Sequence, residues 1–379
     1  MNIEKVILRQ IKMDLLHPFT TSVGTEYDKD VILVEVQSSN GHSGWAESVS
    51  INEPIYNEET IDTNWPMLRK FLLPELLKAP IIAHPSEVSQ RFQSIRGQFN
   101  AKAAVEQAVW DLYAKEQGRP LAEVLGGTKS SIDVGVSIGI TESEDALLEK
   151  IAGYVEEGYK RIKVKIKPGW DVELLRAVRR RFPDLEMMAD ANCAYTLDDI
   201  PRLKQLDELN LTMIEQPLAH DDIIDHAELQ KHLNTPICLD ESLHSYDDVR
   251  KAIELGSCRI VNLKIGRVGG LQETLNIHKL CQDHHIPMWC GGMLETGIGR
   301  AHNIAVTALP QFLYPGDTAP SSHYWERDII QPEVRMNRGE IPVPDKPGIG
   351  FEPDTGYIEQ LTSRKETFRP KDRAVLQQD

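Results

Sequence analysis

The fold is decided by four short runs in the middle of the chain: RIKVKI (161–166), LEMMAD (185–190), TMIE (212–215) and ICLD (237–240). Each run is strand-like, and a longer stretch with helical spacing of its apolar residues lies between one run and the next. Parallel strands must be joined by a crossover, usually a helix, so this alternation predicts a parallel sheet with helices on its faces.

Four further runs extend the rhythm on both sides: DVGVS (133–137), RIVNLK (259–264), IPMWC (286–290) and QFLY (311–314). Eight runs predict a closed barrel whose strands all end at one mouth. The alternative is an open doubly wound sheet, which usually has about five or six strands and binds its ligand where the strand order reverses. We favour the barrel because polar residues end five successive runs, and only a barrel brings them all together.

The first third of the chain has a different pattern. The segment DVILVEV (30–36) alternates like a strand, and the apolar residues over 100–117 repeat at helical spacing. Asn100 is placed to cap that helix, since a short polar side chain can accept from the first free backbone N–H groups. This region therefore predicts an α+β unit separate from the barrel.

The C-terminal tail breaks the rhythm. It contains the Pro- and Gly-rich stretch IPVPDKPGIGFEPD (341–354) and no further clean amphipathic helix. We expect this tail to return to the N-terminal unit. The predicted domains are therefore 1–126 plus 318–379 for the capping unit and 127–317 for the barrel.

Composition limits the partners and the location. The chain has 42 Lys and Arg against 58 Asp and Glu, a net charge of −16, which excludes nucleic acid and anionic membrane surfaces as partners. Charged residues interrupt the N-terminal segment and no run of about 18 apolar residues occurs, so we expect a cytoplasmic protein. The five cysteines form no C-x-x-C pair and are expected to be reduced thiols.

Three carboxylates end consecutive runs: Asp190, Glu215 and Asp240, each 25 residues from the next. Hard oxygen ligands without His or Cys suit Mg²⁺ or Mn²⁺ and suit Zn²⁺ poorly. Any one of these carboxylates alone would more simply pair with a lysine or cap a helix. Three carboxylates at the same position of three consecutive strand–helix units favour a metal site instead.

Lysines end the neighbouring runs. Lys163 and Lys165 point to one face of their strand, and Lys264 ends a strand on another wall of the mouth. Each cation lowers the pKa of its neighbour and burial acts in the same direction, so one amine is expected to be neutral near pH 7. Lys165, nearer the mouth, is the predicted base. Amines flanking a metal-bound carboxylate predict removal of the proton next to that carboxylate.

Six segments of the sequence are similar to those of a known family. They are RIKVKIKPGWD (161–171), MADANCAYT (188–196), IEQPL (214–218), CLDESL (238–243), NLKIGRVGGL (262–271) and CGGMLETGIGR (290–300). They resemble the muconate-lactonising subgroup of the enolase superfamily, and within it the o-succinylbenzoate synthase and N-succinylamino acid (N-acylamino acid) racemase group. The resemblance implies a (β/α)7β modified TIM barrel under an α+β capping domain built from both chain ends. It also implies a homo-oligomer, because the family tends to self-associate.

Carried over residue by residue, the resemblance assigns roles. Lys165 and Lys264 become the acid/base pair, and Lys163 would tune Lys165 and contact the substrate carboxylate. Asn192 would orient a ligand of the Mg²⁺ ion that Asp190, Glu215 and Asp240 hold. The resemblance also implies substrate contacts, namely Phe19, Ser22, Gly24, Tyr56, Ser137, Gly292 and Met293, with Arg267 biasing racemase against synthase. Phe19 and Tyr56 are alternatively plain core aromatics of the capping domain.

The family implies two related reactions on a small carboxylate substrate with a succinyl or N-acyl group. One is dehydration of 2-succinyl-6-hydroxy-2,4-cyclohexadiene-1-carboxylate to 2-succinylbenzoate, a lyase step of menaquinone biosynthesis. The other is racemisation of an N-succinyl or N-acylamino acid. Dipeptide epimerase and muconate cycloisomerase are further alternatives within the family.

Two alternative hypotheses assign the chain to other classes of protein. A Schiff-base aldolase would use Lys264 as a nucleophile, since a desolvated amine at a strand end can condense with a ketone. A non-catalytic metal-binding barrel is the second, and the three lysines argue against it because a metal site alone has no use for three amines.

Overall fold

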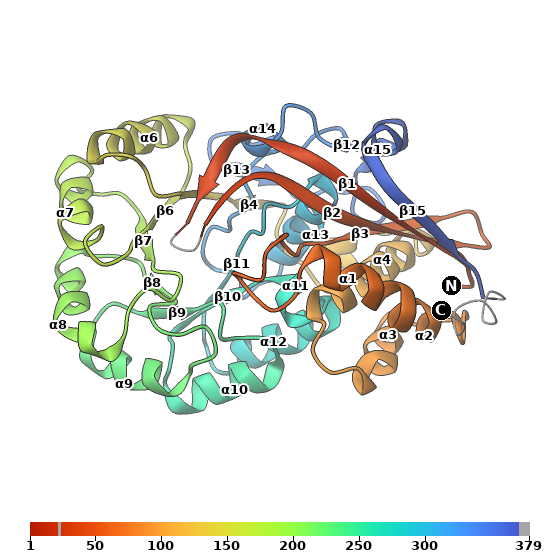
Figure 1. Cartoon of the computed structure of the whole chain (residues 1–379), viewed down its shortest axis with the longest axis horizontal. Coiled ribbons are helices and arrows are strands. Elements are labelled where there is room, and N and C mark those ends of the chain that lie inside the picture. Colours follow the sequence, from red (N-terminus) through yellow and green to blue (C-terminus); the bar gives the residue numbers. More distant parts are fainter. Residues whose placement is uncertain (22–23, 371–379) are drawn as a thin grey trace.

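Seven parallel strands form the central sheet of the computed structural model, which describes residues 1–21 and 24–370. The strands follow one another in chain order from β5 to β11, and every neighbouring pair is parallel. They are β5 (Gly135–Ile138), β6 (Arg161–Lys165), β7 (Met187–Asp190), β8 (Ile214–Glu215), β9 (Ile237–Leu239), β10 (Ile260–Leu263) and β11 (Met288–Cys290). The sheet curls around an interior, as the predicted barrel requires (Figure 1).

The eighth run closes this sheet without forming a full strand. Phe312 bridges Met288 of β11, and Gly316 bridges Val134 just before β5. The expected strand over 311–314 is therefore wrong in extent. Proline supplies the physical reason: Pro315 has no N–H for a ladder bond, and its carbonyl instead accepts from the Arg161 guanidinium at 2.9 and 3.2 Å.

Helices cover the outside of the barrel (Figure 1). They are α6 (Glu144–Glu157), α7 (Val172–Arg181), η3 (Leu197–Asp199), α8 (Ile200–Leu203), η4 (Lys204–Leu209), α9 (Ile224–His232), α10 (Tyr246–Leu255), α11 (Ile265–Val268), α12 (Leu271–Asp283) and α13 (Gly297–Thr307). Local signals set several ends; the Ser143 hydroxyl caps α6, which stops at Gly158 in a left-handed conformation. The next helix after the eighth run is the short α14 (Ser321–Tyr324), so the architecture is (β/α)7β with seven full units.

Both ends of the chain meet in one antiparallel sheet, ordered β15-β1-β2-β3. Its strands are β1 (Ile3–Thr20), β2 (Thr25–Ser38), β3 (Ser43–Ser48) and β15 (Thr362–Phe368). Val6 lies opposite Phe368, so the tail does return to the N-terminal unit (Figure 1). The division at 126/127 and 317/318 itself stays a prediction.

The remaining elements complete the capping region and the tail. The helices are α1 (Ile61–Met67), η1 (Leu68–Leu72), α2 (Leu73–Leu77), α3 (Ser86–Arg91), η2 (Phe92–Ser94), α4 (Phe99–Glu116), α5 (Leu121–Leu125) and α15 (Thr355–Leu361). The strands are β4 (Ser131–Asp133), which pairs with β13 (Glu340–Pro342), and β12 (Ile330–Gln331), which pairs with β14 (Glu352–Pro353).

Helix α4 matches the helix predicted over 100–117, but its cap does not. The N-cap position is Gln98, and the predicted cap Asn100 lies inside the helix. The Glu59 carboxylate from a distant loop accepts from the N–H groups of Asn100 and Ala101 at 3.0 and 3.2 Å. A tertiary contact has therefore replaced the local cap, which sequence alone could not reveal.

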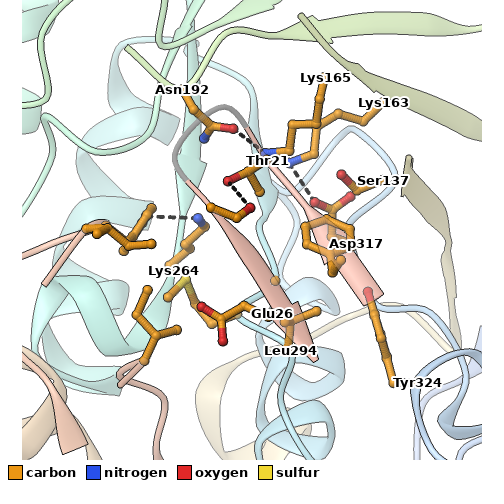
Figure 2. A pocket seen from close by; sticks show the side chains of 17 residues that line it. Thr21, Glu26, Ser137, Lys163, Lys165, Asn192, Lys264, Leu294, Asp317 and Tyr324 are labelled. Atoms are coloured by element: carbon orange, nitrogen blue, oxygen red, sulfur yellow. Dashed lines mark hydrogen bonds and ion pairs between the residues drawn. The ribbon is translucent and has the colours of Figure 1, made fainter. Parts of the chain in front are cut away.

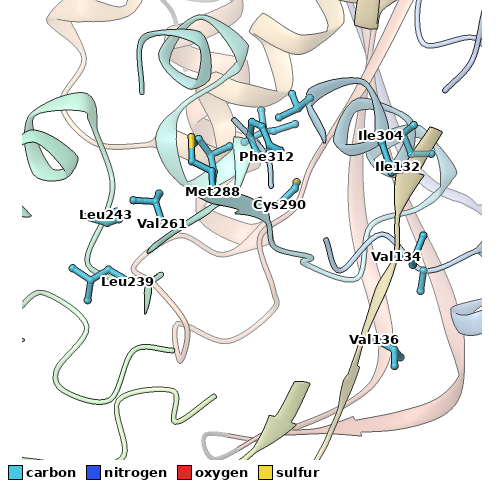
Figure 3. Packing of buried hydrophobic residues seen from close by; sticks show 14 of the residues in the cluster. Ile132, Val134, Val136, Leu239, Leu243, Val261, Met288, Cys290, Ile304 and Phe312 are labelled. Atoms are coloured by element: carbon cyan, nitrogen blue, oxygen red, sulfur yellow. The ribbon is translucent and has the colours of Figure 1, made fainter. Parts of the chain in front are cut away.

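Strand residues divide between two cores by alternation. Leu239, Val261 and Met288 face outward to the helices (Figure 3). Their neighbours Cys238, Ile260 and Trp289 form a separate buried cluster with Met188 and Met213. All five cysteines are unpaired thiols, as predicted, and four of them are buried.

Candidate active site

The polar strand-end residues converge at one mouth, as the barrel predicts. In the ladder Lys165 lies opposite Asp190, and Asp190 lies opposite Glu215. Asp240 follows β9 and Lys264 follows β10 by one residue each. The three carboxylate residues are at most 1% exposed, so their charges are held away from water and need partners.

Lys163 sits at the centre of the buried charges. Its Nζ lies 2.8 Å from Asp317 and 3.2 Å from both Asp190 and Glu215. It also lies 4.9 Å from the centre of the Trp289 ring in the barrel interior. Burial disfavours the charged amine, but the three carboxylates outweigh burial and raise the pKa of Lys163.

Lys165 is bound by two acceptors from the end of β7 and the loop after it. Its Nζ donates to Asp190 Oδ2 and to Asn192 Oδ1, both at 2.6 Å. Asn192 in turn donates to Glu241 Oε1 at 2.9 Å, which orients its oxygen toward the amine. Burial would raise the pKa of Asp190, but Lys165 and Lys163 outweigh burial and lower it.

Lys264 is bound from both the barrel and the capping region. Its Nζ donates to Asp240 Oδ2 and to the Tyr56 hydroxyl, each at 2.8 Å, and lies 4.4 Å from the centre of the Tyr56 ring. A Cβ at Gly291 would lie 2.7 Å from Lys264 Cε, so this glycine makes room for the lysine side chain.

The sequence predicts a lowered pKa within the Lys163–Lys165 pair, whereas the pKa of Lys163 is raised. The pKa of Lys264, for which no lowering was predicted, is raised as well. Burial does oppose the charged form of Lys264, but Tyr56, Glu241 and Glu215 outweigh it and raise its pKa. The prediction of a lowered lysine pKa considered only two effects, the neighbouring cation and burial. The carboxylates that the fold packs around the amines have the larger effect, and the spacing of the sequence did not reveal how close they lie.

These side chains line a cavity of about 110 Å³. Lys163, Lys165 and Asn192 enter it from one side and Lys264 from another (Figure 2). Of the predicted substrate contacts, six line it: Phe19, Gly24, Tyr56, Ser137, Gly292 and Met293. Ser22 lies outside the described residues.

Arg267 does not line this cavity. Its guanidinium lies behind Tyr56 and Asp240, donating to both, and donates to the carbonyls of Asn262 and Leu243 at 2.6 and 2.8 Å. The side chain is 2% exposed. Any influence on the reaction would therefore pass through Asp240 and Tyr56.

Sequence reasoning missed several residues of the cavity wall. Asp317 and Tyr324 line it, and so do Glu26 and Leu294 (Figure 2). Asp317 had a usable signal, because it follows the eighth run at the same mouth where the other strand-end carboxylates lie. Tyr324 lies in the irregular tail, where no periodic pattern marks it.

Two family models match most of the chain. The N-terminal domain model of mandelate racemase and muconate lactonizing enzyme matches residues 3–126, and the enolase C-terminal domain-like model matches residues 146–357. The chain belongs to the enolase superfamily. This result confirms the resemblance carried by the six segments.

Individual members of the superfamily are closely similar over almost their whole length. An o-succinylbenzoate synthase from Geobacillus kaustophilus is 60% identical, covering 97% of this chain and 98% of that protein. An N-succinylamino acid racemase from Thermus thermophilus is 45% identical, covering 96% and 98%. The crystal structure of an enolase-superfamily member from Listeria innocua superposes with a TM-score of 0.95 at 43% identity, covering 98% of this chain and 100% of that one.

Enolase-superfamily enzymes of this kind generally use Mg²⁺. As the side chains stand within residues 1–21 and 24–370, no three His, Cys, Asp or Glu residues form a ready metal cluster, and lysines occupy the carboxylate oxygens. The donor set nevertheless fits the ion: it consists of buried carboxylates on three adjacent strand ends. Glu241 adds a buried Oε2 without a hydrogen-bond partner in the described region.

The loops of this enolase-superfamily mouth hold unusual backbone conformations. Asn192, Cys193, Gln216 and Leu294 have positive φ angles of 40°, 65°, 37° and 56°. Such residues cost about 1–3 kcal/mol each and persist only where the surroundings hold them. The Gln216 side chain shows how: it donates to Ser242 Oγ at 2.6 Å and accepts from the Asp240 N–H at 3.0 Å, which ties the end of β8 to Asp240.

Proposed function

We propose that the protein is an o-succinylbenzoate synthase that also racemises N-succinylamino acids, both by removing a proton α to a carboxylate. The observation that carries this proposal is that Lys165 and Lys264 line one cavity from different walls, each bonded to a buried carboxylate. Relatives named for both activities, at 60% and 45% identity, support it.

In the dehydration, Lys165 Nζ takes the α-proton of 2-succinyl-6-hydroxy-2,4-cyclohexadiene-1-carboxylate, and the 6-hydroxyl group leaves as the ring becomes aromatic. Lys165 must first give up its own proton, and Asp190 and Asn192 hold the amine in place. Lys264 stays protonated and stabilises the negative charge that develops on the substrate carboxylate. Its raised pKa suits that role.

In the racemisation, the same two amines exchange roles. One lysine removes the α-proton from one face of the N-acylamino acid, and the other delivers a proton to the opposite face. Asp190, Glu215 and Asp240 would hold Mg²⁺, which when bound supplies positive charge for the substrate carboxylate. We assign the succinyl group to the wall of Ser137, Gly292 and Met293, with Phe19, Gly24 and Tyr56 closing over it.

The proposal is tested by assaying the purified protein with both substrates. We expect turnover of the cyclohexadiene carboxylate and of N-succinylamino acids, and the ratio of the two kcat/KM values decides which activity dominates. Failure with both substrates, while a dipeptide is epimerised or muconate is cyclised, would replace this proposal by the corresponding alternative.

Metal removal separates the proposal from the aldolase hypothesis. We expect EDTA to abolish both activities and Mg²⁺ or Mn²⁺ to restore them. Borohydride with substrate present should trap no adduct on Lys264. A trapped adduct, together with full activity in EDTA, would establish the Schiff-base aldolase instead.

We place this enzyme in the cytoplasm as a homo-oligomer without nucleic-acid or membrane partners. Five cysteines, none of them in a disulfide, support that location. Within the described part of the chain, no helix is long and apolar enough to cross a membrane. Size-exclusion chromatography with light scattering tests the oligomer.

A further inference from the structure

A second, larger cavity lies beside the catalytic one. It has a volume of about 610 Å³ and shares three wall residues with the catalytic cavity: Phe19, Ser137 and Tyr324. Its other walls come from β1, from α6 with the charged Lys150 and Glu157, from the loop after β5, and from α14. The shared residues therefore form a partition between the catalytic cavity and this outer groove, and Ser137 and Tyr324 are seen on one side of the catalytic cavity in Figure 2.

Aromatic rings line the groove. Tyr154 packs edge-on against Tyr159 at 5.3 Å, and His323 packs edge-on against Tyr324 at 4.6 Å. The Tyr154 and His323 rings, 5.7 Å apart, join the two pairs into one cluster. Such a surface offers edges and faces on which a further ring can pack.

Two polar atoms at the groove lack partners. The Tyr159 hydroxyl and the Ser137 hydroxyl are both buried, and neither has a hydrogen-bond partner within the described chain. Tyr159 is only 6% exposed. Neither hydroxyl oxygen is exposed to the open volume of the groove, so the aromatic rings, and not these hydroxyls, form the surface that a ligand would meet.

Gly153 supports the interpretation of the groove as open space. It lies inside α6, where glycine is less favourable than alanine. A Cβ at this position would meet no atom within 4 Å, so neither packing nor a turn requires the glycine. Its effect is to leave the groove wall without a side chain.

The volumes of the catalytic cavity and of the groove indicate how large a substrate the two can hold together. Small-molecule sites usually measure about 300–1,000 Å³. The catalytic cavity alone, at about 110 Å³, falls below that range, whereas the two cavities together fall within it. The succinyl group assigned above to the Ser137 wall points to the shared partition, so a longer acyl chain would continue into the groove.

We propose that the groove between α6 and α14 is an acyl-chain subsite, which accepts N-acylamino acids whose acyl chain is longer than succinyl and ends in an aromatic ring. This inference rests on the proposed racemase activity. The ring would pack among Tyr154, Tyr159 and His323.

The test uses N-succinyl-L-methionine and N-(4-phenylbutanoyl)-L-methionine as paired substrates, with exchange of the α-proton in D₂O as the readout. We expect the wild-type kcat/KM values to lie within about tenfold of each other. Gly153→Phe fills the groove and should lower kcat/KM for the phenylbutanoyl substrate at least tenfold, with less than a twofold change for the succinyl substrate. Gly153→Ala should leave both values unchanged.

Val155→Phe is the matched control, because Val155 lies on the same helix, is 43% exposed and does not line the groove. It should change neither value more than twofold. The proposal is overturned if the wild type exchanges the succinyl substrate but not the phenylbutanoyl one, or if Gly153→Phe lowers both equally in a protein with wild-type Tm. Absence of exchange with both substrates would instead reject the proposed racemase activity, and this subsite with it.

Discussion

The two lysine walls of the cavity are built differently. Lys165 is held by Asp190 and Asn192, which both come from the end of one barrel strand and its loop. Lys264 is held by Asp240 of the barrel and by Tyr56, which comes from the segment between β3 and α1. One wall is thus complete within the barrel, and the other is completed by the capping region.

Because of this difference, only part of the proposed chemistry depends on the capping region. A proton transfer at Lys165 needs only the barrel, whereas one at Lys264 also needs Tyr56 in place. In the dehydration, Lys264 only has to supply a positive charge that stabilises the developing negative charge on the substrate. In the racemisation, Lys264 also has to transfer a proton. The two activities should therefore respond differently when the two walls are changed.

The largest effect is expected at the barrel wall. Lys165→Ala should lower both α-proton exchange and net dehydration about 10⁴-fold, since the base of both reactions is lost. Steady-state kinetics and exchange in D₂O measure the two losses. Lys167→Ala, at an exposed lysine two residues on, is the control and should leave both unchanged. Dehydration within tenfold of the wild type would show that Lys165 is not the base.

At the other wall, Lys264→Arg keeps a cation but removes the proton-transfer group. Racemisation should fall about 10³-fold and dehydration about tenfold, because guanidinium stays protonated at all working pH values. The kcat/KM of each reaction gives the two numbers. Lys251→Arg, at an exposed surface position, is the control. Equal losses in the two reactions would remove the distinction between the walls.

The barrel wall also carries an ion network that should matter for stability. Asp317 lies 2.7 Å from Arg161 and 2.8 Å from Lys163, and all three are buried. Asp317→Asn should lower the free energy of unfolding by about 3 kcal/mol, because it leaves buried cations with less compensation. Urea denaturation at pH 7 measures this value.

The stability lost in Asp317→Asn should become smaller as the pH falls. Burial would raise the pKa of Asp317, but Lys163 and Arg161 outweigh burial and lower it below the ordinary 3.8. Its contribution is therefore complete above pH 3.8 and is lost as the pH falls further, so wild type and variant should converge in acid. Asp283→Asn, in an exposed pair with Lys279, should cost less than about 1 kcal/mol. A similar cost at both sites would argue against the buried network.

The smallest effect is expected from the capping contribution to the Lys264 wall. Tyr56→Phe keeps the ring but removes the hydroxyl that accepts from Lys264, so racemisation should fall about tenfold and dehydration less than threefold. Parallel assays of both reactions provide the ratio. Tyr27→Phe, at a tyrosine that is 66% exposed, is the control. An unchanged ratio of the two rates would show that the Tyr56 hydroxyl does not serve Lys264.

Much of this site was accessible from the order of residues. Strand residues alternate between faces, so Lys163 and Lys165 had to share one, and parallel strands end at one edge, so Asp190 and Glu215 had to lie together. The register bears out both inferences. The same reasoning failed for the cap of α4, because Glu59 reaches that helix from a distant loop.

The architecture and the set of chemical groups at the mouth follow from the order of residues, because periodicity and strand-end position are local properties of the chain. The pairing of those groups depends on the tertiary structure. The carboxylates that raise the pKa values of Lys163 and Lys264, the hydroxyl of Tyr56 and the left-handed backbone of Gln216 all depend on contacts between distant segments. Electrostatic and hydrogen-bond energies change within a few ångströms, and spacing along a chain does not specify distances that short.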